Sequence, residues 1–280
     1  IYLKDNEIAI LTRDNYVVKN FSGETVNPTI DEIKWNLSTI EKKGYKHFML
    51  KEIFEQPISL SNTLRGRLSS NEIKLSVNTG KPSRIIITAC GTSWHSALIG
   101  KHLIEHFASI PVEVDYASEF RYRSPLVNSS DLLIAISQSG ETADTLAALR
   151  EAKSRGARTL GIVNVVGSSI SREVDSGIYL HAGPEIGVAS TKAFSSQVLS
   201  LLLLALHLAG KDKIDPSLLR EIAHLPSLVS MILAQAPMLQ EMAEPFVKSD
   251  HFLYLGRGVN FPVALEGALK LKEISYIHAE

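Results

Sequence analysis

The sequence predicts an α/β fold built on a doubly wound, five-stranded parallel sheet of the flavodoxin-like type. Between residues 81 and 180, five short apolar segments alternate with segments of helical character. A strand that is buried on both faces is apolar at nearly every position, and strands that alternate with helices at this spacing form βαβ units. Five strands of this kind match the flavodoxin-like arrangement.

The five predicted strands share an apolar, β-branched composition and occupy residues 84–89, 112–114, 132–136, 159–163 and 178–180. The helices predicted between them occupy about residues 94–108, 142–155 and 168–173. Parallel strands place their carboxyl ends at one edge of the sheet, and ligands bind outside that edge in open α/β sheets. The loops that follow the strands are therefore the first place to look for chemistry.

Other elements are predicted before this sheet. Residues 7–11 and 16–21 are rich in β-formers and are separated by turn residues, which predicts a hairpin. One hairpin is not stable alone, so it is expected to be the end of a larger domain. Helices are predicted at about residues 30–43 and 48–69.

Helical structure also dominates the region after the sheet. Residues 190–247 are predicted to be helical, with interruptions at glycine and proline residues. The most apolar run, 198–209, is about 12 residues long and well short of the ~20 residues that a membrane span needs, so it is interpreted as a buried helix. A further buried strand is predicted at 252–256, and a helix from Pro262 to the end, as in the opening βα unit of a second domain.

Composition excludes several classes of function. The chain is 45% hydrophobic and 21% charged, with a formal net charge of −1, so neither nucleic acid nor a membrane is an expected partner. Its single cysteine, Cys90, excludes an intrachain disulfide and favours a reducing, cytoplasmic compartment. The first residues have no signal-peptide pattern. The histidines have no metal-ligand spacing, so no metal or cofactor is expected, and Cys90 and His95 are interpreted as structural.

Hydroxyl-rich turns follow two of the predicted strands. Thr92 and Ser93 come after the first strand, and the sequence Ser-Gln-Ser-Gly-Glu-Thr at 137–142 comes after the third. Backbone N–H groups and the helix dipole at such turns bind an anion without a basic side chain. The alternative is that these hydroxyls only cap helices. Two such turns at one edge favour a phosphate, and the absence of nucleotide-binding motifs favours a small phosphorylated metabolite.

A third loop, 185–192, follows the last strand at the same edge. Ser190 or Thr191 could cap the next helix, or the loop could close over a ligand with the backbone of Val188 and with Ser190. Lys192 is interpreted as a solvated or ion-paired lysine.

The predicted terminal helix carries three charged residues on one face. Glu266, Lys270 and Glu273 have the spacing i, i+4, i+7. A carboxylate beside a lysine suits proton transfer between adjacent carbons of a sugar. A solvated stripe of ion pairs would have the same spacing, and spacing alone favours the stripe.

Together these residues resemble the isomerase part of the glutamine–fructose-6-phosphate aminotransferase family, also called glucosamine-6-phosphate synthases. The matching segments are 90–93, 117–123, 137–145, 185–194 and 265–280. The segment 44–57 resembles the join between the glutaminase and isomerase parts of that family. The 137–142 motif alone would indicate only a sugar isomerase (SIS) domain. The resemblance covers essentially the whole chain.

The resemblance implies a conversion of fructose 6-phosphate and glutamine-derived ammonia to glucosamine 6-phosphate. It implies that the sugar phosphate is held by Ser93, Ser137, Gln138, Ser139 and Thr142. It implies that the sugar contacts Thr92, Val188 and Ser190. Glu273 would move a proton between C1 and C2, with Glu266 and Lys270 as its polar neighbours.

The resemblance also implies a domain organisation. Its parts are a C-terminal hairpin of a glutaminase domain (1–28), a helical linker (29–80), a first SIS domain (81–215), a helical connection (216–247) and the beginning of a second SIS domain (248–280). Glutamine would then act only through a glutaminase domain outside these residues. The expectation is a fragment that forms a homodimer and cannot complete amination alone. A non-catalytic phosphosugar-binding module and a simple ketose–aldose phosphate isomerase remain the alternatives.

Overall fold

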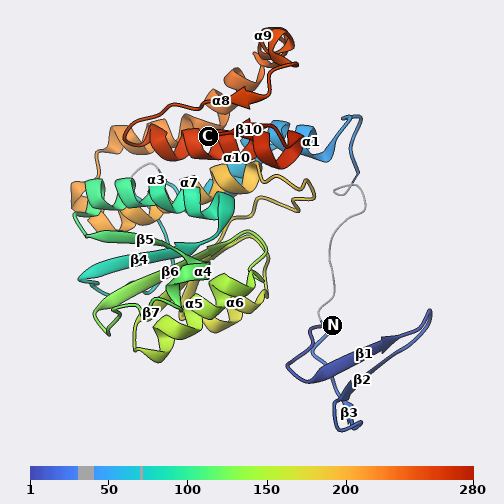
Figure 1. Cartoon of the computed structure of the whole chain (residues 1–280). Coiled ribbons are helices and arrows are strands. Elements are labelled where there is room, and N and C mark those ends of the chain that lie inside the picture. Colours follow the sequence, from blue (N-terminus) through green and yellow to red (C-terminus); the bar gives the residue numbers. More distant parts are fainter. Residues whose placement is uncertain (31–40, 70–71) are drawn as a thin grey trace. The chain divides into compact units, whose positions relative to one another are not determined.

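The chain divides into two compact units, residues 1–41 and 42–280 (Figure 1). The computed structural model describes residues 1–30, 41–69 and 72–280. Most of the helix predicted at 30–43 therefore lies outside the described residues.

The first unit contains a three-stranded antiparallel sheet. Strands β1 (Glu7–Leu11) and β2 (Tyr16–Asn20) form the predicted hairpin, with Leu11 opposite Tyr16. In the turn between them, the Thr12 hydroxyl donates to the carbonyl of Asn15 at 3.0 Å. A short third strand, β3 (Thr25–Val26), pairs with β2 and was not predicted.

The second unit is built on a five-stranded parallel sheet, which confirms the predicted fold class. The strands are β4 (Arg84–Ala89), β5 (Val112–Tyr116), β6 (Asp131–Ser137), β7 (Arg158–Val163) and β8 (Ser176–Tyr179). Their order in the sheet is β5-β4-β6-β7-β8, which is the flavodoxin-like order. All five predicted strands are confirmed within a few residues, and all seven residues of β6 are buried.

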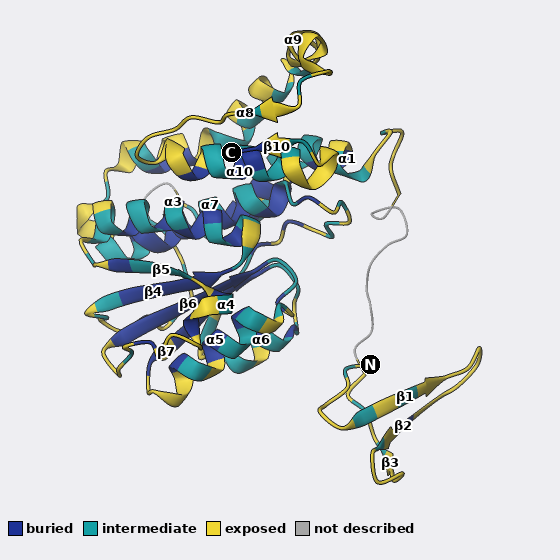
Figure 2. Cartoon of the chain, viewed as in Figure 1, coloured by how far each residue is buried: buried dark blue, intermediate teal, exposed yellow. Residues whose placement is uncertain are grey.

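Helices cover both faces of this sheet (Figures 1 and 2). Ile85 and Ile87 of β4 pack in one apolar cluster with α3 (Gly91–Ala108) and α7 (Lys192–Ala209). Ile86 faces the other way because side chains alternate along a strand. Its cluster includes residues of α4 (Ala117–Phe120), α5 (Ala143–Ser154) and α6 (Ser169–Glu173).

A further layer of helices packs on the outer side of α7. The predicted helix at 48–69 is instead two helices, α1 (Phe48–Phe54) and α2 (Gln56–Leu64). The break has a physical cause, because Pro57 lies in the first turn of α2 and lacks a backbone N–H. Leu60 of α2 packs in a third cluster with residues of α7 and α8 (Pro216–Leu233).

The apolar helix α7 is the core helix of this unit. Its 18 residues are long and apolar enough to cross a membrane, but 61% of that window is buried inside the protein. The next helices are a short 3₁₀ turn η2 (Lys211–Lys213), α8, α9 (Ala236–Ala243) and η3 (Glu244–Phe246). The helical region predicted at 190–247 is therefore confirmed, with breaks at Gly210, before Pro216 and before Pro237. The break predicted at Pro226 is wrong, because α8 continues through this proline.

The buried strand predicted at 252–256 is wrong. The strand β9 spans only His251–Phe252 and pairs in parallel with β10 (His278–Ala279). Leu253 and Leu255 are 75% and 91% exposed. These apolar residues have no layer of the described residues over them, so apolar composition alone did not make them a core strand. The last helix, α10 (Asn260–Ser275), begins two residues before the predicted Pro262 and ends at Ser275, so the prediction that it continues to residue 280 is wrong.

The packing of α7 gives the first testable prediction. Leu204 is fully buried between α7 and the sheet, whereas Leu239 on α9 is 52% exposed. Leu204→Ala is expected to lower the free energy of unfolding by about 2–5 kcal/mol because it leaves a cavity in the core. The control, Leu239→Ala, is expected to change it by less than about 0.5 kcal/mol. Urea unfolding followed by circular dichroism measures both, and equal losses would contradict this assignment of the core.

Candidate functional site

The helix α10 docks on the N-terminal end of α3 through a buried carboxylate. Glu266 is 6% exposed, and its Oε1 accepts a hydrogen bond from the Thr92 hydroxyl at 2.9 Å. Thr92 stands in the first turn of α3, directly after strand β4. The contact joins residues 174 positions apart in the chain. It brings the terminal helix to the carboxyl edge of the sheet.

The second oxygen of Glu266 is bound by a histidine. Nδ1 of His95 lies 2.7 Å from Oε2 of Glu266, and both side chains are buried. Burial opposes ionisation of Glu266, but His95, Lys270 and Thr92 outweigh it and hold the pKa of Glu266 below its ordinary value. His95 was interpreted as structural from the sequence. Thr92 and His95 are three residues apart and so lie on the same face of α3, and this spacing was the sequence feature that could have pointed to His95.

Lys270 connects the charged face of α10. Its Nζ lies 3.3 Å from Glu266 Oε1, donates to the Thr92 hydroxyl at 2.9 Å, and donates to Glu273 Oε2 at 2.7 Å. The interpretation as a solvated stripe fails at Glu266, which is buried. Glu273 lies at the open end of the network, with its side chain 34% exposed.

The hydroxyl loop after β6 is held by its own hydrogen bonds. The Ser137 hydroxyl lies 2.9 Å from the Thr142 hydroxyl and accepts from the N–H of Gly140 at 3.0 Å. The Ser139 hydroxyl accepts from the N–H of Glu141 at 3.2 Å. Gly140 has a φ of +68°, and a Cβ there would lie 2.0 Å from the Ser168 hydroxyl, so only glycine fits.

These hydroxyls do not act as helix caps. Thr142 is the N-cap residue of α5 and Cys90 that of α3, and within the described residues neither helix has a side-chain cap. The first N–H groups of both helices therefore have no side-chain acceptor there. The alternative that the hydroxyls are only caps does not hold for α5.

Two other predicted phosphate ligands have different surroundings. Ser93 is 8% exposed, and its hydroxyl accepts from the Gln197 side chain at 2.9 Å, within a buried network that includes Ser96. Gln138 is half-buried, and its backbone carbonyl accepts from the N–H of Asn164 at 3.1 Å. Since β4 and β6 pair with Thr88 opposite Ala135, the loops that follow both strands begin side by side.

The loop between β8 and α7 is organised by Glu185. Its Oε2 accepts from the Ser190 hydroxyl at 2.8 Å, and its Oε1 accepts from the N–H of Thr191 at 2.8 Å. The Glu185 carboxylate therefore accepts hydrogen bonds from the backbone N–H groups at the start of α7. Neither Ser190 nor Thr191 caps this helix with its side chain. Val188 is 95% exposed at the tip of this loop. Lys192 is ion-paired, as predicted, but it is buried rather than solvated.

A cavity of about 210 Å³ brings three parts of the chain together. Its lining comes from α1 and the start of α2, from the loop before α7 and the first turn of α7, and from α10. The lining residues are Met49, Ile53, Gln56, Ser190, Thr191, Phe194, Glu266 and Lys270. The predicted residues Ser190, Glu266 and Lys270 thus meet at one cavity, with Thr92 and Glu273 bonded to Lys270. The α1 residues were not predicted.

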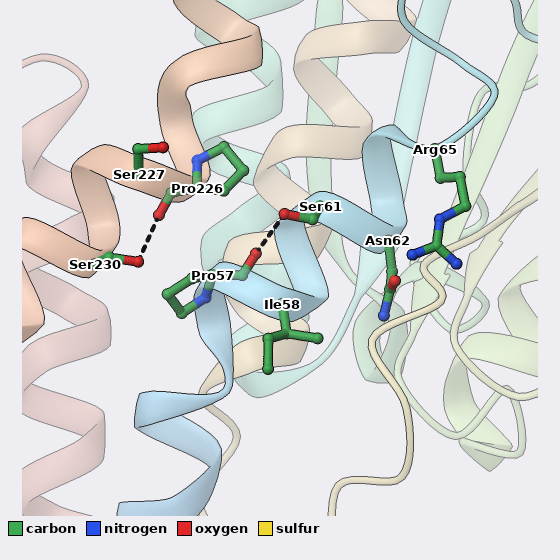
Figure 3. A pocket seen from close by; sticks show the side chains of 8 residues that line it. All are labelled: Pro57, Ile58, Ser61, Asn62, Arg65, Pro226, Ser227 and Ser230. Carbon is green, nitrogen blue, oxygen red and sulfur yellow. Dashed lines mark hydrogen bonds between the residues drawn. The ribbon is translucent and has the colours of Figure 1, made fainter.

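A larger cavity of about 340 Å³ lies between α2 and α8 (Figure 3). Ser61 and Ser230, which line it, donate to the carbonyls of Pro57 and Pro226 in their own helices. Arg65 is the charged residue of its lining. No residue predicted for the site lines this cavity, so size alone does not make it the candidate site.

Cys90, at the end of β4, has the surroundings of a structural cysteine. Burial raises the pKa of its thiol, so the reactive thiolate is disfavoured.

Comparisons with known proteins agree with this geometry. Residues 80–207 match the model of the SIS domain family. The whole chain is 54% identical to the glutamine–fructose-6-phosphate aminotransferase (isomerizing) of Chlorobaculum tepidum and 52% identical to that of Bacteroides thetaiotaomicron, and it covers 48% of each. The chain thus spans about half the length of the curated relatives it matches.

Solved structures give a similar result. The C-terminal domain of glucosamine-fructose-6-phosphate aminotransferase from Francisella tularensis matches with a TM-score of 0.82 and 44% identity, over 86% of this chain and 70% of that one. A glucosamine-6-phosphate deaminase from Thermotoga maritima matches with a TM-score of 0.64 and 23% identity, over 84% of this chain and 69% of that one. The second similarity shows a shared fold alone.

The buried Glu266 gives a prediction about pH. Its folded-state pKa lies below the ordinary value of 4.5, so its ionised form stabilises the fold above that pH, and this stabilisation is lost as the pH falls through the lower folded-state pKa. The substitution Glu266→Gln is therefore expected to lower the free energy of unfolding more at pH 6 than at about pH 4. Urea unfolding at both pH values measures this difference. The exposed Glu241→Gln is the control, and a loss that does not change with pH would contradict the prediction.

Proposed function

The chain belongs to the glutamine–fructose-6-phosphate aminotransferase family, and we propose that it is the part that binds fructose 6-phosphate and converts it to glucosamine 6-phosphate. The observation that carries this proposal is the hydroxyl loop 137–142, which lies at the uncapped N-terminus of α5. That loop follows β6, and the neighbouring strand β4 is followed by Thr92, which bonds to Glu266 and Lys270 of α10.

The loop suits a phosphate group. Ser137, Ser139 and Thr142 offer three hydroxyls, and the N-terminus of α5 adds backbone N–H groups and the positive end of a helix dipole. The stretch 137–142 contains no lysine or arginine, so the phosphate would be held by neutral donors in fixed positions. Gln138 and Ser93 would complete this part of the site.

The network of α10 suits the chemistry at the sugar. Glu273 would move the proton between C1 and C2, because it is the accessible carboxylate of the network. Lys270 would hold it in position through the 2.7 Å hydrogen bond. Glu266 would in turn fix Lys270. Thr92, Ser190 and the backbone of Val188 would contact the sugar from the two neighbouring loops.

Several partners follow from the family. The names of the relatives support ammonia derived from glutamine as the nitrogen donor, supplied by a glutaminase domain of which residues 1–28 would be the last hairpin. Residues 248–280 would begin a second SIS domain. A homodimer in the cytoplasm is the proposed working form. A non-catalytic phosphosugar module would keep loop 137–142 but would not need the buried Glu266–Lys270 pair.

Calorimetric titration of the chain with fructose 6-phosphate, and separately with free fructose, tests the phosphate site. Binding is expected for fructose 6-phosphate alone. The double variant Ser139→Ala with Thr142→Ala is expected to weaken it at least tenfold, since hydrogen bonds to a charged group contribute about 1.5–3 kcal/mol each. Ser154→Ala, at the other end of α5, is the control.

Two results would count against the proposal. Equal binding of fructose and fructose 6-phosphate would mean that the phosphate is not recognised. Unchanged binding by the double variant would place the phosphate away from loop 137–142.

A further inference from the structure

The loop before α7 is held from outside by a glutamate of α1. Glu52 is 2% exposed, and its Oε1 accepts from the N–H of Ile186 at 2.6 Å. Its Oε2 accepts from the N–H of Gly187 at 3.1 Å. These bonds join residues 134 and 135 positions apart. Two consecutive N–H groups of the loop are therefore fixed by one side chain from a different part of the chain.

The fit between Glu52 and the loop requires a glycine. A Cβ on Gly187 would lie 2.6 Å from Oε2 of Glu52 and 3.3 Å from the backbone of Met49. The absence of a side chain at 187 therefore lets α1 approach the loop backbone directly. Its φ is not in the left-handed region, so close approach, not backbone conformation, is what demands glycine here.

A second pair of charges joins Glu55, between α1 and α2, to the first residue of α7 after the same loop. Lys192 is 3% exposed, and its Nζ donates to Oε2 of Glu55 at 2.8 Å. Lys51, one turn earlier, lies 3.5 Å from the other oxygen of Glu55. Burial raises the pKa of Glu52, while its bonds to the loop and the charge of Lys192 act in the opposite direction. The loop is thus held on both sides of its exposed tip at Val188.

The same face of α1 also lines the candidate site. Met49 and Ile53 line the 210 Å³ cavity together with Ser190 and Thr191 of the loop. Glu185 holds the Ser190 side of the loop from within, and Glu52 holds the Ile186–Gly187 side from α1. Removing the Glu52 carboxylate would free two loop N–H groups, yet it would not touch loop 137–142.

We propose that Glu52 is a positioning residue that holds the loop 185–191 in the shape that recognises the sugar of the substrate. This inference rests on the proposed function, because it assigns the sugar to that loop and the phosphate to loop 137–142. The sugar and the phosphate of the substrate are thus assigned to two different loops, which can be altered separately. A change at Glu52 should therefore weaken recognition of the sugar and spare recognition of the phosphate.

The test compares two ligands on one variant. Glu52→Gln keeps the size of the side chain but replaces one acceptor oxygen with an NH₂ donor that cannot accept from the loop. Its affinity for fructose 6-phosphate is expected to fall about tenfold, because the loop would hold its binding shape for only about a tenth of the time. Its affinity for inorganic phosphate is expected to stay within about twofold. Calorimetry measures the first affinity, and a titration followed by protein NMR measures the second.

Two further variants make the result specific. Gly187→Ala introduces the 2.6 Å clash without changing any charge, and it is expected to give the same selective loss even if Glu52→Gln folds poorly. Glu72→Gln, at a partly exposed glutamate paired with Lys74, is the matched control and is expected to change neither affinity.

The outcomes separate the inference from the proposed function. If the unaltered chain binds fructose 6-phosphate and both site variants bind it equally well, Glu52 does not position the loop and the inference is wrong. If the variants lose the same factor of affinity for fructose 6-phosphate and for inorganic phosphate, the role of Glu52 is only structural. That result also overturns the inference. If the unaltered chain binds inorganic phosphate but does not prefer fructose 6-phosphate, the proposed function itself fails.

Discussion

Burial of the central sheet on both faces is the constraint on which the site depends. Every residue of β6 from Asp131 to Ser137 is buried, and helices cover Ile85 and Ile86 on opposite faces of β4. Polar groups cannot be placed within such a layer without a large desolvation cost. The chain must therefore present its reactive groups where the strands end. Parallel pairing sends the ends of β4, β6 and β8 to the same edge, so three loops of different chemistry meet there.

Charged side chains occur at this edge both in a loop and on the helices that pack against it. Glu185 lies in the loop after β8, whereas Glu266 and Lys270 lie on α10. Each buried charge there has a partner: Glu266 with His95 and Lys270, and Lys192 with Glu55. A buried ion without a partner would cost several kcal/mol. Glu273, at the open end of the network, is the carboxylate that keeps access to solvent.

The sequence predicted what depends on local pattern and missed what depends on docking. Apolar runs predicted the five strands, and the spacing of Glu266, Lys270 and Glu273 predicted a shared helical face. Glu52 could not be found this way, because its partners in the loop before α7 lie 134 and 135 positions away and no periodicity links them. His95 had only its i, i+3 spacing from Thr92, and its partner Glu266 lies 171 positions away. The strand predicted at 252–256 was wrong for a related reason. An apolar segment becomes buried only where another layer of the structure packs over it. Leu255 is exposed because no such layer covers it among the described residues.

The residues that flank the sheet, more than the sheet, give the site its individual chemistry. The SIS family match covers residues 80–207, yet Met49, Gln56, Glu266 and Lys270 of the cavity lie outside that range. A fold of this kind recurs at 23% identity in a deaminase, so the sheet alone does not define a function. Under the proposed function, the helices that dock over the sheet edge and the carboxylates they carry would decide what happens to the sugar. Function on a shared fold resides in such added elements. In this chain α1 comes before the sheet in sequence and α10 after it, and the 210 Å³ cavity is lined by residues of both helices.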